Sequence, residues 1–162
     1  MSELIVVNIS DVKVAPNPAT FVTYALGSCV GICLYDAFTK SAGLAHIMLP
    51  VHPEEKRPSG QIFRYADTCL PESVRLMEKL GCLRTRMTAK IAGGAKMFKV
   101  ANDSAFGNIG QRNIAAVKQT LSDLHIRIIA EDTGADYGRT VYFNSETGKM
   151  TVKSFSQGIK IF

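Results

Sequence analysis

The sequence has no tryptophan, few histidines and no apolar run long enough to cross a membrane. A membrane-spanning helix needs about 20 predominantly apolar residues in succession. The N-terminal stretch, MSELIVVNIS, also lacks the basic region and the small-residue cleavage site of a signal peptide. These absences predict a cytoplasmic protein with no membrane insertion.

Paired cysteine motifs and charge runs are absent as well. The four cysteines, Cys29, Cys33, Cys69 and Cys82, form no C-x-x-C pair, which excludes the common zinc and dithiol redox motifs. The net charge of +5 is spread along the chain without a block of Lys or Arg, so nucleic acid is not indicated as a partner. A lone G-x-x-G at Gly107–Gly110 resembles a phosphate-cradling or RNA-binding turn but is more typical of a tight loop. We expect neither a metal nor another cofactor.

The composition that remains is that of an ordinary globular protein. Hydrophobic residues make up 46% of the chain and charged residues 20%, and the mean hydropathy is +0.08. A chain of 162 residues suits one domain of typical size. We expect residues 1–162 to form a single domain.

The apolar pattern predicts several strands and two helices. Alternating or β-branched runs indicate strands, and apolar residues spaced by three and four indicate amphipathic helices. The expected strands are Leu4–Ile9, Val12–Ala15, Cys29–Asp36, Gly43–Leu49, Met87–Ala92, Ile126–Ala130, Thr140–Phe143 and Met150–Phe155. The expected helices are Gln61–Leu80, in which Pro71 marks a kink or a late start, and Gly110–Leu124. Because many strands are joined by short turns, we predict an α+β fold with a mixed sheet.

The two strands that flank residues 37–40 form the most informative part of the chain. If Ala37–Lys40 is the hairpin loop, Asp36 faces Ser41 and Cys29 faces Met48. His46 is then a diagonal neighbour of Cys29 on the same face, roughly 5 to 8 Å away at the Cβ atoms. A two-residue loop would also bring them together, whereas an odd loop without a bulge would place them on opposite faces.

A cysteine and a histidine in this arrangement can perform nucleophilic catalysis. The thiolate is the nucleophile, and a neighbouring imidazole can take the thiol proton and return it to a leaving group. Thr23, on the Ala19–Tyr24 segment that approaches the Cys29 turn, is a candidate to hold the ring in one tautomer. Gly27 and Ser28 are candidates for positioning substrate, with the Cys29 N–H stabilising an oxyanion.

Each of these residues also has a purely structural interpretation. A cysteine in an apolar strand is often a small core residue, and we interpret Cys33, Cys69 and Cys82 in that way. We expect His52 to be solvated in the polar loop that follows Pro50, and His125 to end a helix. Basic side chains beside the glycine-rich loops are interpreted as a solvated surface, although they could form a docking face for an acidic partner: Lys90, Lys96, Lys99, Arg112 and Arg139.

The sequence resembles the CheD family of chemoreceptor glutamine deamidases over nearly its whole length. The matching motifs are Thr23, Leu26-Gly27-Ser28-Cys29-Val30, Leu34-Tyr35-Asp36, Gly43-x-Ala45-His46-x-Met48-Leu49-Pro50, Phe63-Arg64-Tyr65-Ala66-Asp67, Lys90-Ile91-Ala92-Gly93-Gly94-Ala95, Ile109-Gly110-x-Arg112-Asn113, Asp132-x-Gly134 and Gly138-Arg139-Thr140. Ala135 departs from the family pattern, which often has a second glycine there. Because alanine disfavours a positive φ, we expect this turn to differ.

The resemblance implies a layered α/β sandwich, largely antiparallel and related to toxin-type deamidases. It implies Cys29 as the nucleophile, His46 as the base and Thr23 as the orienting residue. It also implies chemoreceptor cytoplasmic domains as substrate, and a CheC-type phosphatase as a regulatory partner in species that have one. The alternative function is a non-catalytic adaptor that binds and stimulates such a phosphatase.

Overall fold

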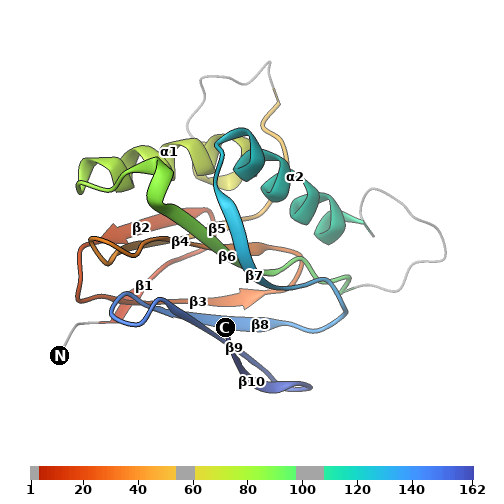
Figure 1. Ribbon diagram of the computed structural model, residues 1–162. Helices are drawn as coiled ribbons and strands as arrows, with labels where there is room; N and C mark the ends of the chain where they lie inside the picture. The colour runs from red at the N-terminus through yellow and green to blue at the C-terminus, as the bar shows by residue number, and fades with distance from the viewer. Residues whose placement is uncertain (1–3, 54–60, 98–107) are drawn as a thin grey trace.

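The structure is a computed structural model that describes residues 4–53, 61–97 and 108–162. Two five-stranded sheets and a layer of two α-helices, α1 (Ala66–Lys79) and α2 (Ile109–Asp123), are stacked on one another (Figure 1). The outer sheet has the order β1 (Leu4–Val6), β3 (Thr20–Leu26), β8 (Arg139–Asn144), β9 (Lys149–Ser154), β10 (Gly158–Ile161). The central sheet has the order β2 (Asp11–Ala15), β5 (Ser41–Ile47), β4 (Val30–Asp36), β6 (Met87–Gly93), β7 (Arg127–Thr133). The β1–β3 and β6–β7 pairs are parallel, and the other strand pairs of the two sheets are antiparallel.

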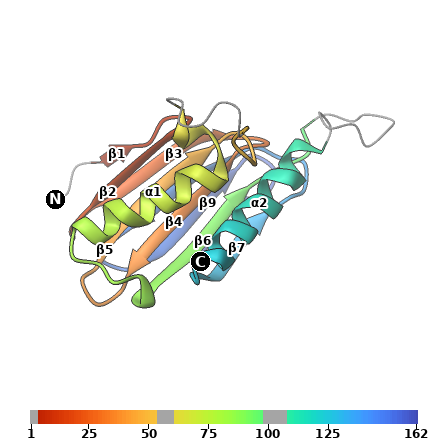
Figure 2. The same cartoon turned by 90° about the horizontal axis from the view of Figure 1, so that it is seen from above.

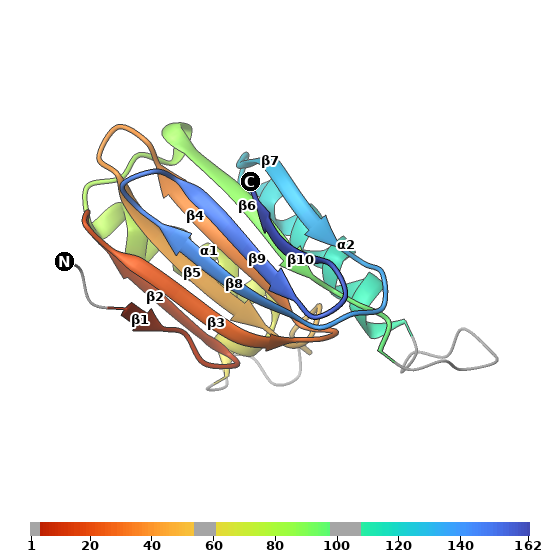
Figure 3. The same cartoon turned by 90° about the horizontal axis from the view of Figure 1, so that it is seen from below.

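The central sheet is buried on both faces, which explains why β4 and β5 are continuous apolar runs in the sequence. One face packs against both helices (Figure 2), through residues such as Ile32, Ile47 and Met77. The other face packs against the outer sheet, where Leu44 lies in one cluster with Phe21 and Phe143. No helix of the described residues covers the far face of the outer sheet (Figure 3).

The predicted α+β class and layered sandwich are confirmed, with two sheets in place of the single mixed sheet suggested by the apolar pattern. The Ala19–Tyr24 segment, expected to be only an approach to the Cys29 turn, contributes most of β3 (Thr20–Leu26), a full strand of the outer sheet. The edge strand Gly158–Ile161 was not predicted. Its two isoleucines are exposed, so no burial pattern distinguishes it from a loop.

Both predicted helices are present with slightly different ends. The first begins at Ala66, after a single 3-10 turn at Ile62–Arg64. Pro71 lies inside it, so the alternative of a late start is wrong. Pro71 is the sixth residue of α1, beyond the first four N–H groups that have no partner within a helix, so it removes one hydrogen bond of the helix.

Candidate active site

The β4–β5 hairpin has the predicted loop and register. Asp36 pairs with Ser41 around the Ala37–Lys40 loop, and Gly31 pairs with His46. The strand begins at Val30, so Cys29 is the last residue of the preceding turn. The Cys29 side chain packs against the cluster between the two sheets. Because side chains alternate along a strand, His46 faces the same layer.

Thr23 reaches His46 from the opposite sheet and determines its tautomer. The Thr23 hydroxyl donates to the carbonyl oxygen of Val7 at 2.7 Å and lies 2.7 Å from His46 Nδ1. A hydroxyl has only one hydrogen to donate. The His46 bond must therefore be donated by Nδ1–H to the threonine oxygen, which leaves Nε2 without a proton.

The unprotonated Nε2 is the chemically available nitrogen of this ring. It is buried and has no hydrogen-bond partner among the described residues. Burial lowers the pKa of His46 from 6.5 to about 4, so the ring is a neutral base at neutral pH. Burial also raises the pKa of the Cys29 thiol, which the hydrogen bond from its own backbone N–H offsets only in part. The resting site therefore holds a neutral thiol and a neutral imidazole.

A β-bulge in β3 places Thr23 in this layer. Thr23 pairs with Val141 and Leu26 with Arg139, so three steps along β3 match two along β8. Residues three apart in a regular strand face opposite sides. The extra residue, with Ala25 at φ 61°, instead allows both Thr23 and Leu26 to face inward, where each is 0% exposed.

The turn that carries Cys29 is held by its carbonyl groups. The Gly27 oxygen accepts from Ala95 N at 2.8 Å, and the Cys29 oxygen accepts from Gly94 N at 2.8 Å. A Cβ on Gly93 would lie 2.3 Å from the Cys29 oxygen, so only glycine fits there. The N–H of Gly27 donates to Ala25 O at 3.1 Å and is not free for substrate.

The N–H groups of Ser28 and Cys29 differ from that of Gly27. Within the described part of the chain, no backbone carbonyl accepts a hydrogen bond from either of them. They remain the candidate oxyanion donors.

The other cysteines and His125 have the structural places predicted for them. Cys33, Cys69 and Cys82 are buried core residues, as expected. His125 follows the end of α2 at φ 59°, also as expected. The described residues hold no group of three His, Cys, Asp or Glu side chains suited to a metal ion, and none of their helices is long and apolar enough to cross a membrane.

Two predicted surface residues are in fact buried. His52 is 2% exposed, against the ring of Tyr65, so the expectation of a solvated side chain is wrong. Its flanking polar sequence hid this contact with a residue thirteen positions away along the chain. Arg139 is 3% exposed because it pairs with Asp132 at 3.4 Å and stacks on Tyr137.

Several other expectations concern the loops. Ala135 adopts φ 58°, so the expectation that alanine would change this turn by avoiding a positive φ is wrong. Lys99, Gly107 and most of the loop after Pro50 lie outside the described residues. Asn113 was noted only as part of a family motif, yet it contacts the turn that carries Cys29. A lone polar residue on a helix gives no sequence signal of such a contact.

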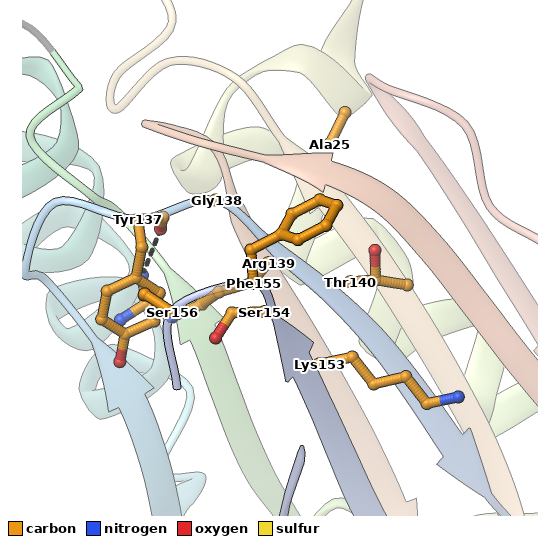
Figure 4. Close-up of a pocket in the computed structure, with 9 residues that line it drawn as sticks. All are labelled: Ala25, Tyr137, Gly138, Arg139, Thr140, Lys153, Ser154, Phe155 and Ser156. Carbon is orange, nitrogen blue, oxygen red and sulfur yellow. Dashed lines mark hydrogen bonds between the residues drawn. The ribbon is translucent and has the colours of Figure 1, made fainter. Parts of the chain in front are cut away.

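A surface cavity lined by residues of β8 and β9 is separate from this site. It has a volume of about 530 Å³ and opens beside Tyr137, Lys153 and the fully exposed Phe155. Figure 4 shows these side chains around the ends of β8 and β9, with Ala25 at one edge. The cavity touches the β3 bulge but contains none of the predicted catalytic side chains.

A cysteine at a strand entrance, facing the layer that holds a tautomer-fixed histidine, is the arrangement expected of a thiol-dependent hydrolase or acyltransferase. Comparison with known proteins narrows this class. The family model for CheD chemotactic sensory transduction matches residues 48–154, and the chain belongs to this family.

Similar proteins match over nearly their whole length. A probable chemoreceptor glutamine deamidase CheD from Syntrophomonas wolfei is 45% identical, with 99% of each chain covered. A chemoreceptor glutamine deamidase CheD from Halalkalibacterium halodurans is 43% identical, again with 99% of each covered. The sequence resemblance to the CheD family is therefore confirmed.

The comparison with solved structures also finds a similar fold. The Neisseria meningitidis protein NMB0706, of family-model DUF152, superposes with a TM-score of 0.51 at 12% identity. The match covers 82% of this chain and 64% of that chain, which is less than two thirds of it. This similarity concerns the fold alone.

Proposed function

We propose that this protein is a protein-glutamine deamidase that converts Gln side chains of chemoreceptor cytoplasmic domains to Glu. Cys29 is the nucleophile, His46 the general base and Thr23 the residue that orients His46. The observation that carries the proposal is the Thr23–His46 bond at 2.7 Å, since it leaves an unprotonated Nε2 on the face that Cys29 shares. The names of the similar proteins support the choice of substrate.

The chemistry follows from the protonation states. His46 Nε2 takes the proton of the Cys29 thiol as Sγ attacks the carboxamide carbon of glutamine. The protonated ring gives this proton to the departing nitrogen, and ammonia leaves a thioester on Sγ. His46 then takes a proton from water, which attacks the thioester carbon. The products are glutamate and a regenerated Cys29 thiol, and the ring returns its proton to sulfur.

The tetrahedral intermediates carry a negative oxygen that requires hydrogen-bond donors. We assign this role to the N–H groups of Ser28 and Cys29, with Gly27 shaping the turn. Donors fixed before the reaction stabilise developing charge without reorganisation. The bonds to the carbonyls of Gly27 and Cys29 supply that rigidity.

Mass spectrometry of a receptor fragment tests the activity. Incubation with the wild-type protein should convert particular Gln residues to Glu, and Cys29→Ala should abolish conversion while circular dichroism shows an intact fold. The matched control is Cys33→Ala, which removes a buried thiol from the same strand face and should leave conversion intact. Conversion that continues with Cys29→Ala would rule out the mechanism.

The alternative is the adaptor that binds a CheC-type phosphatase. Such a phosphatase is also the regulatory partner that the family resemblance implies. A substrate in the cytoplasmic domain of a receptor supports a cytoplasmic location for the protein. The two functions are separated by one comparison. The adaptor is favoured if the wild-type protein has no deamidase activity and Cys29→Ala still stimulates the phosphatase at wild-type strength.

A further inference from the structure

Asn113 contacts both segments that carry the candidate catalytic pair. It lies on α2 and is 0% exposed. Its Nδ2 donates to the carbonyl oxygen of Ser28 at 2.9 Å and to that of Met48 at 2.9 Å. Ser28 immediately precedes Cys29, and Met48 follows His46 by two residues. One side-chain amide therefore spans the two segments.

The contact occurs where the backbone ladder between those segments ends. The β4–β5 pairing ends at Val30 and Ile47. Beyond this point Met48 N donates to Arg64 O at 2.9 Å, so the chain after β5 turns toward another partner. Among the described residues, the β4–β5 ladder therefore gives no hydrogen bond between the Cys29 turn and the chain after Ile47. The Asn113 amide takes over that role.

The helix itself is tightly fixed against the same region. A Cβ on Gly110 would lie 2.4 Å from the Ala95 oxygen and 2.6 Å from the Gly94 oxygen. Gly94 and Ala95 are the residues whose N–H groups hold the carbonyls of Cys29 and Gly27. Asn113 adds the carbonyl of Ser28, so the carbonyls of three consecutive residues all accept hydrogen bonds from this region. The amide therefore acts from a rigid support.

We propose that Asn113 is a positioning residue that sets the geometry between the Cys29 thiol and His46 by bridging the carbonyls of Ser28 and Met48. The role rests on the proposed deamidase function for its biological meaning, but the contact can be tested on the thiol alone. Both neighbours are oxygens, so the amide must present its NH₂ group to them. The amide oxygen is buried without a partner in the described structure. The side chain therefore serves as a double donor.

Few substitutions preserve this function. Aspartate has the same shape but offers only acceptors when ionised, so it would repel both carbonyls. Alanine removes the bridge and leaves two buried acceptors unpaired. Small displacements of reacting groups reduce rates strongly: a shift of about 1 Å can lower a rate by a hundredfold.

The test uses the full-length protein and measures two properties of Asn113→Ala and Asn113→Asp. The first is the pH dependence of Cys29 alkylation by iodoacetamide, followed by peptide mass spectrometry. The second is kcat and KM for receptor deamidation. We expect the component of alkylation that depends on His46, defined with His46→Ala, to fall about tenfold or more. We expect kcat to fall similarly, with KM changed less than about threefold.

Thr120→Val is the matched control for helix stability. Thr120 is also a buried polar residue of α2, but it donates to Ala116 O at 2.8 Å within the helix. Loss of the Thr120 hydroxyl should leave the pH profile of Cys29 alkylation and kcat unchanged. Each variant is assayed well below its own melting temperature, and Asn113→Asp, which creates no cavity, supplies the result if the alanine variant unfolds.

The outcomes separate this proposal from the proposed function. Alkylation profiles of both Asn113 variants that match the wild type would overturn the positioning role, whether or not the protein deamidates receptors. Altered profiles together with a wild-type protein that modifies no receptor glutamine would uphold the positioning role and refute the proposed substrate.

Discussion

At the residue scale, the decisive feature is the protonation of His46. Thr23 fixes the proton on Nδ1 by giving its own hydrogen to Val7. Burial then keeps the ring neutral by lowering its pKa to about 4. A neutral imidazole beside a neutral thiol differs from a preformed thiolate–imidazolium pair, because the proton moves only when Sγ attacks. This difference is measurable.

The pH profile of kcat/KM should reflect the lowered pKa. A general base works in its unprotonated form, which His46 retains above about pH 4 because burial disfavours the charged ring. We therefore expect kcat/KM to stay level as the pH falls from neutrality to about 5 and to decline only nearer pH 4. Steady-state kinetics, with circular dichroism as a check of folding at each pH, provide the measurement. An acid limb centred near the ordinary histidine value of 6.5 would contradict it.

Contacts between residues on one hairpin could be predicted from the sequence, whereas contacts between distant segments could not. Cys29 and His46 were predicted together because they lie on one hairpin, where counting loop residues determines the shared face. The bond between Thr23 and His46 joins two sheets, and no alternation rule reaches across layers. Thr23 was a candidate only because its segment approaches the Cys29 turn.

Asn113 was missed because its partners, Ser28 and Met48, are distant along the chain. The burial of Arg139 was missed for another reason: its partners Asp132 and Tyr137 lie close by in an irregular turn, where no alternation of side chains indicates burial.

At the element scale, β3 is the strand of the outer sheet whose irregular burial pattern kept it from being predicted in full. Its burial does not alternate: Phe21, Val22 and Thr23 are buried in succession, and the bulge at Ala25 then turns Leu26 inward as well. A pattern search with period two fails at such an irregularity. Strands β4 and β5 were predicted well because burial on both faces produces continuous apolar runs. The irregular strand is the one that delivers the residue orienting His46.

The bulge residue itself predicts a stabilising substitution. Ala25 is exposed and has φ 61°, a conformation that glycine adopts with less strain than alanine. Ala25→Gly should raise the free energy of unfolding by about 0.5–1 kcal/mol, since the relief of strain exceeds the added flexibility of the unfolded chain. Urea unfolding measures the change, and deamidase activity should be unaltered.

Ala37→Gly is the control of opposite sign. Ala37 is exposed in the β4–β5 loop and has no positive φ, so glycine there adds only flexibility to the unfolded state. We expect a small loss of stability. Two substitutions with the same sign would show that the φ of Ala25 does not govern the effect.

At the scale of the whole molecule, one end of β4 carries the candidate nucleophile and the other end stabilises the fold. Cys29 lies at one end, and Asp36 lies about 20 Å away at the other, given the rise of a strand. Asp36 is 0% exposed and accepts from the N–H groups of Leu83 at 3.1 Å and Phe38 at 3.0 Å. Arg86 Nε donates to both of its oxygens at 3.0 Å. The Asp36 end therefore fixes the connection between α1 and β6 and stabilises the fold away from the site.

This separation predicts that Arg86→Met lowers stability without lowering activity. Removing the cation leaves a buried carboxylate, so we expect a loss of about 2–4 kcal/mol at neutral pH, measured by urea unfolding. Arg84→Met is the control, because its ion pair with Glu78 at 3.5 Å is exposed and contributes about 0.5 kcal/mol or less. Below the melting temperature, kcat should remain that of the wild type, since the substitution is remote from Cys29.

The pH dependence of that loss identifies its cause. Burial raises the pKa of Asp36, but the hydrogen bonds from Arg86, Leu83 and Phe38 outweigh it, and the net pKa is below the ordinary 3.8. A carboxylate with a lowered pKa contributes stability that is complete above its unfolded pKa and is lost as the pH falls through its folded pKa. The difference between wild type and Arg86→Met should therefore be largest near neutrality and shrink below about pH 4. A difference that is constant from pH 7 to pH 3 would instead assign the effect to lost packing of the arginine side chain on Phe38.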